Sequence, residues 1–261
     1  MRIIFIHGIS TQPTNYSERL YGRILAACRA RLKAAGRSDA AVDATLRRLV
    51  HHEIFWAELT TDLTNRYMDL SYEHPKFFWD VLTQPLDPLF IQIMAYIHDK
   101  GTKVDGDMNI LRHVESEFRR IFHDNDLGQS EPANSDRKAI VIAHSLGTVI
   151  AFDYLMGFRR YKVHHSIDVE RFITMGSPIP LFTSAMGHPD SDLSLPPQVK
   201  KWINIRSPRD GVARPMKPFF RHIPIDEHLV HTKFSPLSSH NAYWTDSTTA
   251  DLIAAQILSS F

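Results

Sequence analysis

The sequence of 261 residues holds only one cysteine, Cys28, which cannot form a disulfide within the chain. Cys28 recurs with Leu20, Ile24 and Leu32 at four-residue intervals, the spacing of the buried face of a helix. We therefore expect it to be a small buried apolar side chain rather than a reactive thiol.

An excess of charge of one sign is also missing. Lys and Arg total 30 and Asp and Glu total 29, which gives a formal net charge of +1. A protein that follows a phosphate backbone needs a strongly basic surface, so we expect no nucleic-acid partner. The 15 histidines would raise the charge in mildly acidic solution, because histidine titrates there.

Long uninterrupted hydrophobic runs are absent as well. Residues 77–97 are rich in apolar side chains, but acids, amides and prolines interrupt them well before the roughly 18 clean residues that a membrane span needs. The apolar run at residues 3–6 is too short for a secretory signal and leads directly into His7 and Gly8. We therefore expect a cytoplasmic protein that does not span a bilayer.

The sequence lacks the spacings of common metal sites. Residues 51–52 and 164–165 are adjacent histidine pairs, whose side chains would diverge on either a strand or a helix. Asp124, Asp126 and Gly128 are similar to part of a calcium loop, but the remaining ligands and the terminal glutamate are missing. We predict no metal ion and no cofactor.

What is present is enough apolar sequence, 43% of residues, to bury one sizeable core. Short apolar runs alternate with helical patterns, which is typical of strands covered by helices on both faces. The runs fall at residues 3–6, 54–57, 139–143 and 171–175, and a more mixed one at 199–205. Helical periodicity covers residues 17–35, which stop at Gly36, and a closing helix at residues 248–258. We predict one α/β domain over residues 1–261 with a mainly parallel sheet.

The segment from about residue 60 to residue 137 breaks this alternation and is predicted to be a helical insertion. Its later part has a helical apolar pattern over residues 110–121, and a polar loop follows at 124–137. Its centre carries an apolar cluster that includes Phe77, Phe78, Trp79 and Phe90. This cluster is either the core of the insertion or a lid and acyl pocket that binds substrate.

The most informative stretch is residues 139–155, an apolar strand, a tight turn at Ser145 and an apolar helix. A sharp strand-to-helix turn requires small residues two positions before and after its centre, and these are Ala143 and Gly147. This is the context of a G-x-S-x-G nucleophile elbow, with alanine in place of the first glycine. The helix that follows would offer the backbone N–H of Leu146 to a developing oxyanion.

With this elbow the chain resembles the α/β-hydrolase superfamily, and within it the lipase and esterase branch. Residues 5–9 resemble the early strand that ends in His-Gly in this family, which implies a second oxyanion donor at the backbone of Ile9 or Ser10. Residues 172–178 resemble the strand that ends in a Gly-Ser-Pro turn. The resemblance implies an α/β-hydrolase fold without the usual two leading strands, and so a sheet of about six strands flanked by helices.

Two further segments carry the resemblance to the remaining strand ends. Residues 202–212 resemble the acid strand and turn, which implies Asp210 as the triad carboxylate. Residues 239–243 resemble the histidine loop, which implies His240 as the base. The order Ser145, Asp210, His240 is the order of the superfamily. The long stretch between Gly8 and the elbow strand departs from the family pattern and again indicates an insertion.

Other residues compete for the acid and base roles. Asp226 lies in a strand-like run and Asp246 follows His240, so loop position and chain order favour Asp210. Among the histidines, His240 is favoured because it lies in a polar loop of serines. The rival histidines are His222, His228 and His231.

These observations predict a serine hydrolase that cleaves a carboxylic ester, a small molecule or a lipid, through an acyl-enzyme. The same triad would serve an acyltransferase, a thioesterase or an amidase, and a catalytically silent binding protein on the hydrolase fold is the alternative from another class. Peripheral membrane contact stays open, because Arg214, Lys217 and Arg221 would either bind an anionic head group or form a solvated face. The oligomeric state is not predicted.

Overall fold

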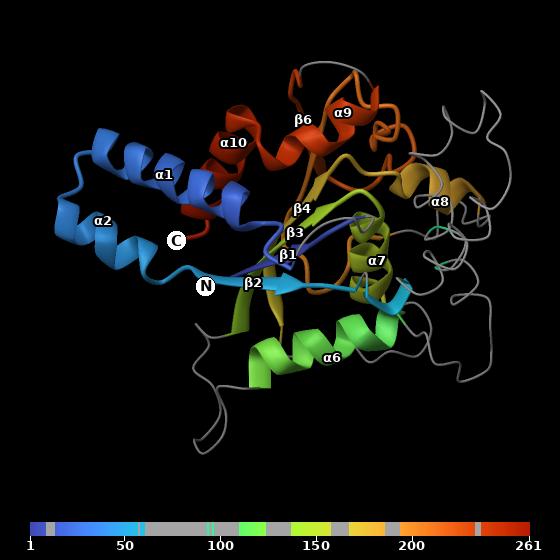
Figure 1. Ribbon diagram of the computed structural model, residues 1–261, viewed down its shortest axis with the longest axis horizontal. Helices are drawn as coiled ribbons and strands as arrows, with labels where there is room; N and C mark the ends of the chain where they lie inside the picture. Colours follow the sequence, from blue (N-terminus) through green and yellow to red (C-terminus); the bar gives the residue numbers. More distant parts are fainter. Residues whose placement is uncertain are drawn as a thin grey trace, which may run out of the picture.

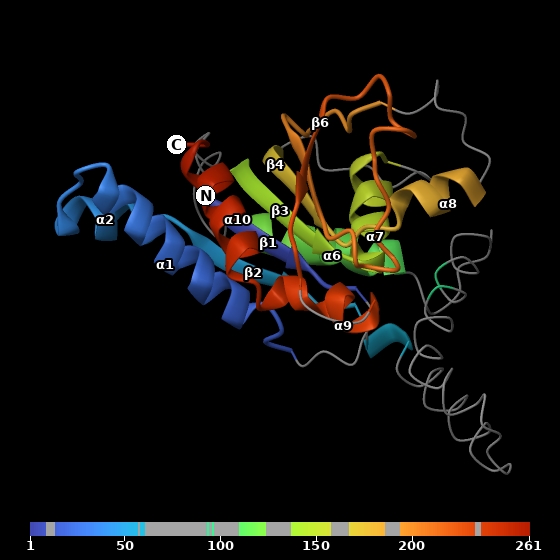
Figure 2. The same ribbon diagram turned by 90° about the horizontal axis from the view of Figure 1, so that it is seen from above.

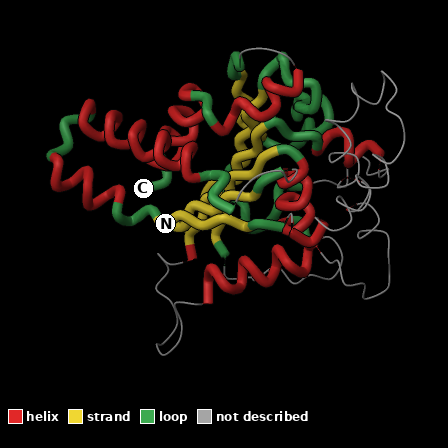
Figure 3. The backbone as a smooth tube through the Cα atoms, viewed as in Figure 1, coloured by secondary structure: helices red, strands yellow, loops and turns green. Residues whose placement is uncertain are grey.

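The computed structural model describes residues 1–8, 14–56, 58–60, 93, 96, 110–123, 137–157, 167–185, 194–232 and 236–261. Its centre is a six-stranded sheet in the order β2-β1-β3-β4-β5-β6, in which every neighbouring pair is parallel (Figures 1 and 3). The strands are β1 (Arg2–Ile6), β2 (Val50–Ile54), β3 (Lys138–His144), β4 (Asp168–Met175), β5 (Trp202–Arg206) and β6 (Ile225–Leu229). Because all strands run the same way, their carboxyl ends share one edge of the sheet.

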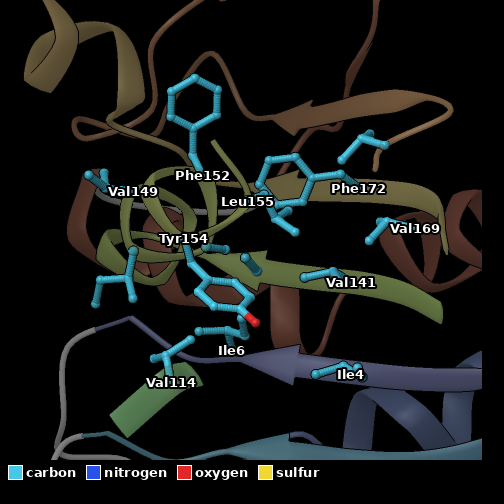
Figure 4. Close-up of a cluster of buried hydrophobic side chains, with 14 of the residues drawn as sticks. Ile4, Ile6, Val114, Val141, Val149, Phe152, Tyr154, Leu155, Val169 and Phe172 are labelled. Carbon is cyan, nitrogen blue, oxygen red and sulfur yellow. The ribbon is translucent and has the colours of Figure 1, made fainter. Parts of the chain in front are cut away.

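Successive side chains of each strand point to opposite faces of the sheet, and this divides the core into two layers. On β1, Ile4 and Ile6 face one layer, while Ile3 and Phe5 face the other. The first layer packs against α6 (Ile110–His123), α7 (Leu146–Leu155) and α8 (Ile179–Ala185). Figure 4 shows part of it, with side chains of α7 over β1, β3 and β4. The second layer packs against α1 (Glu18–Ala34) and α10 (Ser247–Leu258), on the other side of the sheet in Figure 2.

Local signals set the ends of the outer helices. α1 ends just before Gly36, which adopts a φ of +77°. Ser38 caps α2 (Asp39–Leu46) by accepting a hydrogen bond from the N–H of Ala41. Asp246 caps α10 in the same way, because its carboxylate accepts the N–H of Thr249 at 2.7 Å. The helical patterns at residues 17–35 and 248–258 are therefore confirmed within one residue at each end.

The architecture confirms the predicted parallel sheet of about six strands flanked by helices. The second strand differs in position, because it covers Val50–Ile54 rather than residues 54–57. β2 lies at an edge of the sheet, where His51, His52 and Glu53 are only partly buried. An edge strand accepts such polar residues, so a search for solidly apolar runs misplaces it.

A cluster of partly buried polar side chains ties the connection after β5 to the sheet. Glu227 of β6 accepts hydrogen bonds from Arg206 Nε at 3.0 Å and from the backbone N–H of Met216 at 2.7 Å. Asn204 Nδ2 lies 3.3 Å from the same carboxylate. Burial by itself would raise the pKa of Glu227. The hydrogen bonds and the charge of Arg206 outweigh burial, so the pKa of Glu227 lies below its ordinary value. The connection that carries Asp210 is thus anchored to β6.

Part of the predicted insertion lies within the described residues. α6 covers the helical pattern expected at residues 110–121 and buries Val114 and Phe118 in the first layer. Tyr96 is also buried there, and its hydroxyl donates to the carboxylate of Asp153 on α7. The predicted cluster at Phe77, Phe78, Trp79 and Phe90 lies outside the described residues, so the lid and the domain boundaries stay predictions.

Among the described helices, none combines the length and the apolar character that crossing a bilayer requires.

Candidate active site

Ser145 occupies the sharp turn between β3 and α7, as the sequence predicts. Its φ is +54° and its ψ is −131°, and it is the only described residue other than glycine with a positive φ. A positive φ places Cβ close to the backbone, so this conformation is strained and persists only where the surroundings enforce it. The turn holds Ser145 at the carboxyl edge of the sheet.

The small residues around the turn are required by close packing. A Cβ added to Gly147 would lie 2.1 Å from the carbonyl oxygen of His7, at the end of β1. A Cβ on Gly8 would lie 2.4 Å from the Cβ of Ser145. Ala143 is fully buried beside Ile6 on the neighbouring strand. The elbow and the His-Gly segment therefore pack backbone against backbone, as G-x-S-x-G geometry requires.

The structure brings Ser145, His240 and Asp210 together from three separate connections. His240 Nε2 lies 2.8 Å from Ser145 Oγ, and His240 Nδ1 lies 2.9 Å from Asp210 Oδ2. The side chain of Asp210 is fully buried, whereas that of His240 keeps 10% of its surface exposed. A carboxylate accepts but does not donate, so Nδ1 carries the proton toward Asp210 and Nε2 is free to accept the proton of Ser145.

Asp210 is held by more than the histidine. Its Oδ1 accepts the backbone N–H of Val212 at 2.8 Å and that of Ala213 at 3.2 Å. Burial by itself would raise the pKa of Asp210, but the hydrogen bond and charge of His240, the Val212 N–H and the Tyr243 hydroxyl together lower it below the ordinary value. The carboxyl group is therefore ionised at neutral pH.

Tyr243 is a member of the site that the sequence reasoning did not single out. Its hydroxyl donates to Asp210 Oδ2 at 2.8 Å and accepts the backbone N–H of Ser207 at 2.8 Å. It lies three residues after His240, on the short 3-10 helix Ala242–Trp244. The spacing of three residues can be seen in the sequence. An isolated tyrosine, however, does not indicate which carboxylate it will contact.

His240 lies on a short helix rather than in the loop that the sequence suggests. α9 (Pro236–Asn241) carries it, and the preceding residue Ser239 joins a buried hydroxyl cluster. In this cluster Thr232 Oγ1 donates to Ser207 Oγ at 2.8 Å and also hydrogen bonds to Ser239. Ser239 therefore connects α9, which carries His240, to the turn that carries Asp210.

The His-Gly segment at the end of β1 is ordered by its own histidine. His7 Nδ1 donates to the carbonyl oxygen of Gly8 at 2.6 Å, and its ring stacks on Trp56 at 5.2 Å between centroids. Burial lowers the pKa of His7 to about 4, so the ring is neutral. Ile9, expected to give an oxyanion donor, lies outside the described residues.

Leu146, the other expected donor, is the first residue of α7. The N–H groups of a first helical turn have no acceptor within the helix, so they are available to an anion.

The rival residues take other roles. Asp226 lies on β6, where it pairs with Lys201 at 2.9 Å and approaches His228 at 3.2 Å. Asp246 is the cap of α10. His222 and His231, the two remaining candidate histidines, are exposed on the surface. Neither Asp226 nor Asp246 is part of the hydrogen-bonded set around Ser145.

Comparison with known proteins identifies no sequence family for this chain. No protein-family model matches the sequence, and no curated protein matches it. Among solved structures, the chain is similar to a Xanthomonas campestris pv. campestris protein described as "a putative hydrolase of the alpha/beta superfamily". The identity is 12%, the match covers 100% of this chain and 99% of that one, and the TM-score is 0.44.

The fold assignment rests on topology instead. A six-stranded parallel sheet has helices on both faces, and its third strand in sequence leads through a strained serine turn into a buried helix. Asp210 and His240 follow later strands at the same edge. The chain therefore has an α/β-hydrolase fold.

Proposed function

We propose that this protein is a serine hydrolase that cleaves carboxylic esters through an acyl-enzyme intermediate. The observation that carries the proposal is the hydrogen-bonded relay from Ser145 Oγ to His240 Nε2, at 2.8 Å, and from His240 Nδ1 to Asp210. A serine hydroxyl is a weak nucleophile until a base removes its proton, and this relay supplies the base and the group that orients it.

In the acylation half, Ser145 Oγ attacks the carbonyl carbon of the ester and its proton passes to His240 Nε2. The carbonyl oxygen becomes an oxyanion, and we assign its stabilisation to the backbone N–H groups of Leu146 and Ile9. His240 then gives its proton to the alkoxy oxygen as the carbon–oxygen bond breaks. The alcohol leaves, and the acyl group stays on Ser145.

In the deacylation half, a water molecule takes the place of the alcohol. His240 accepts a proton from the water, whose oxygen attacks the acyl carbon, and then returns the proton to Ser145 Oγ as the carboxylic acid departs. Asp210 stays ionised throughout and stabilises the protonated ring of His240. Its lowered pKa supports that role.

The substrate class we propose is an ester with an apolar acyl chain, either a small molecule or a lipid. The support comes from the sequence, where Phe77, Phe78, Trp79 and Phe90 form an apolar cluster suited to an acyl pocket.

The decisive experiment compares hydrolysis of p-nitrophenyl esters of increasing acyl length by wild type, Ser145→Ala and Ser116→Ala. Ser116 lies exposed on α6 and serves as the matched control. We expect wild type and the control to hydrolyse the esters alike and Ser145→Ala to lose several orders of magnitude in kcat/KM. Equal activity in all three proteins would remove Ser145 from the mechanism.

Labelling with a fluorophosphonate separates the remaining outcomes. Labelling of wild type but not of Ser145→Ala would show an activated serine even where the p-nitrophenyl esters are poor substrates. Failure of wild type both to react with the probe and to cleave any ester would favour a silent binding protein. Added alcohols that appear as new esters among the products would identify acyl transfer instead.

A further inference from the structure

His144 is a buried histidine that the relay does not use. It is the last residue of β3, directly before Ser145, and only 3% of its surface is exposed. Its Nε2 lies 2.7 Å from the backbone carbonyl oxygen of His240. Its ring also packs against the ring of His240, with 4.7 Å between centroids, and against Tyr243 and Trp244.

The chemistry of this contact defines the state of the ring. A carbonyl oxygen only accepts, so Nε2 of His144 carries a proton and donates it to the carbonyl oxygen of His240. Burial, with a smaller contribution from His240, lowers the pKa of His144 to about 3. His144 is thus a neutral imidazole that donates from Nε2 alone, which leaves it as a fixed hydrogen-bond donor rather than a second base.

The position of this donor connects the nucleophile to the base. His144 is covalently joined to Ser145, and its side chain holds the backbone of His240, 96 positions further along the chain. Asp210 fixes the other end of the same residue, at the ring nitrogen Nδ1. The backbone and the ring of His240 are therefore held from two sides.

We propose that His144 is a positioning residue that holds the backbone of His240 so that Nε2 stays within hydrogen-bond reach of Ser145 Oγ. The inference rests on the proposed hydrolase function. An error of about 1 Å in the placement of a catalytic group can cost about 100-fold in rate. Loss of this contact should therefore lower kcat and the reactivity of Ser145, and leave substrate binding nearly unchanged.

Three variants at this position separate the donor from the ring. Glutamine places an amide N–H near the position of Nε2, asparagine is one methylene too short to reach it, and phenylalanine keeps the ring without the donor. We expect His144→Phe and His144→Asn to lower kcat and the rate of fluorophosphonate labelling by about 10- to 100-fold, with KM nearly unchanged. His144→Gln should keep most of both.

The control is His52→Phe. His52 lies on the edge strand β2, level with Ile4, and its Nε2 is buried without a hydrogen-bond partner in the structure. Its replacement should leave kcat unchanged. Thermal unfolding of every variant shows which of them are folded at the assay temperature. If His144→Phe does not fold, the comparison of glutamine with asparagine decides alone, since both are amides.

The outcomes keep the two proposals apart. If Ser145→Ala and His240→Ala abolish activity while folded His144→Phe and His144→Asn behave as wild type, the positioning role is overturned and the hydrolase function stands. A change in KM alone, or equal losses for glutamine and asparagine, would also overturn it. If Ser145→Ala keeps full activity, the hydrolase proposal itself fails.

Discussion

Asp210 shows how a buried charge is kept at the residue scale. Hydrogen-bond donors from four residues, namely Val212, Ala213, His240 and Tyr243, surround its carboxylate. An ionised carboxylate loses its hydration on burial, so it needs such donors to remain charged. The need for such donors explains why Tyr243 lies beside Asp210.

The matched pair Asp210→Asn and Asp226→Asn tests the acid assignment. An amide at position 210 can donate to Nδ1 of His240 and so favour the tautomer that cannot accept the proton of Ser145. We expect Asp210→Asn to lower kcat by about 10³- to 10⁴-fold in the p-nitrophenyl ester assay. Asp226→Asn should leave kcat unchanged, because Asp226 pairs with Lys201 on the sheet edge. The reverse pattern would transfer the acid role to Asp226.

At the scale of elements, the elbow depends on how closely α7 approaches the end of β1. Gly147 touches the backbone of His7, so the contact leaves no room for a side chain. Gly22 on α1 is the opposite case, since a Cβ there would meet nothing within 4 Å. The same residue type thus has a packing role on one helix and none on the other.

Alanine at these two glycines should change stability in opposite directions. Gly147→Ala forces a Cβ into a backbone carbonyl that cannot swing away, and should destabilise the fold by about 3 kcal/mol or more. Gly22→Ala should stabilise it by about 0.5–1 kcal/mol through helix propensity. Urea unfolding of both variants measures the difference. A neutral Gly147→Ala would mean that α7 and β1 are not in close contact.

At the scale of the whole molecule, the sheet buries histidines that stay uncharged. His7 at the end of β1 and His144 at the end of β3 are almost fully buried, and burial lowers their pKa values to about 4 and about 3. In the unfolded chain both would titrate near the ordinary value of 6.5. Folding is therefore linked to the release of protons in acid.

The sign of this linkage predicts acid sensitivity. Below pH 6.5 these histidines bind protons in the unfolded chain but stay neutral in the folded chain. The free energy of unfolding therefore falls as the pH falls toward about 4. Each of the two histidines should contribute up to about 1.4 kcal/mol per pH unit in that window. Urea unfolding between about pH 7 and pH 5 measures the slope. A folded His144→Gln should show a smaller slope, and an unchanged slope would contradict the account.

Prediction from the sequence worked best where the signal is local. The strand, turn and helix around Ser145 lie within 18 consecutive residues, and α1 and α10 have clear periodicity and end signals. His144 and Tyr243 were not recognised, because their partners lie 96 and 33 positions away. Nothing in a linear pattern indicates which distant carbonyl or carboxylate such a side chain will meet.

The parallel α/β class and the serine turn follow from the sequence alone, because apolar periodicity and the strand, turn and helix pattern around Ser145 are visible over short stretches of chain. The folded structure was needed to show that β2 is a half-polar edge strand and that His240 lies on a helix. It also decided which donors surround Asp210. Those features depend on which strand ends meet at one edge of the sheet, and that is settled by the packing of the whole chain.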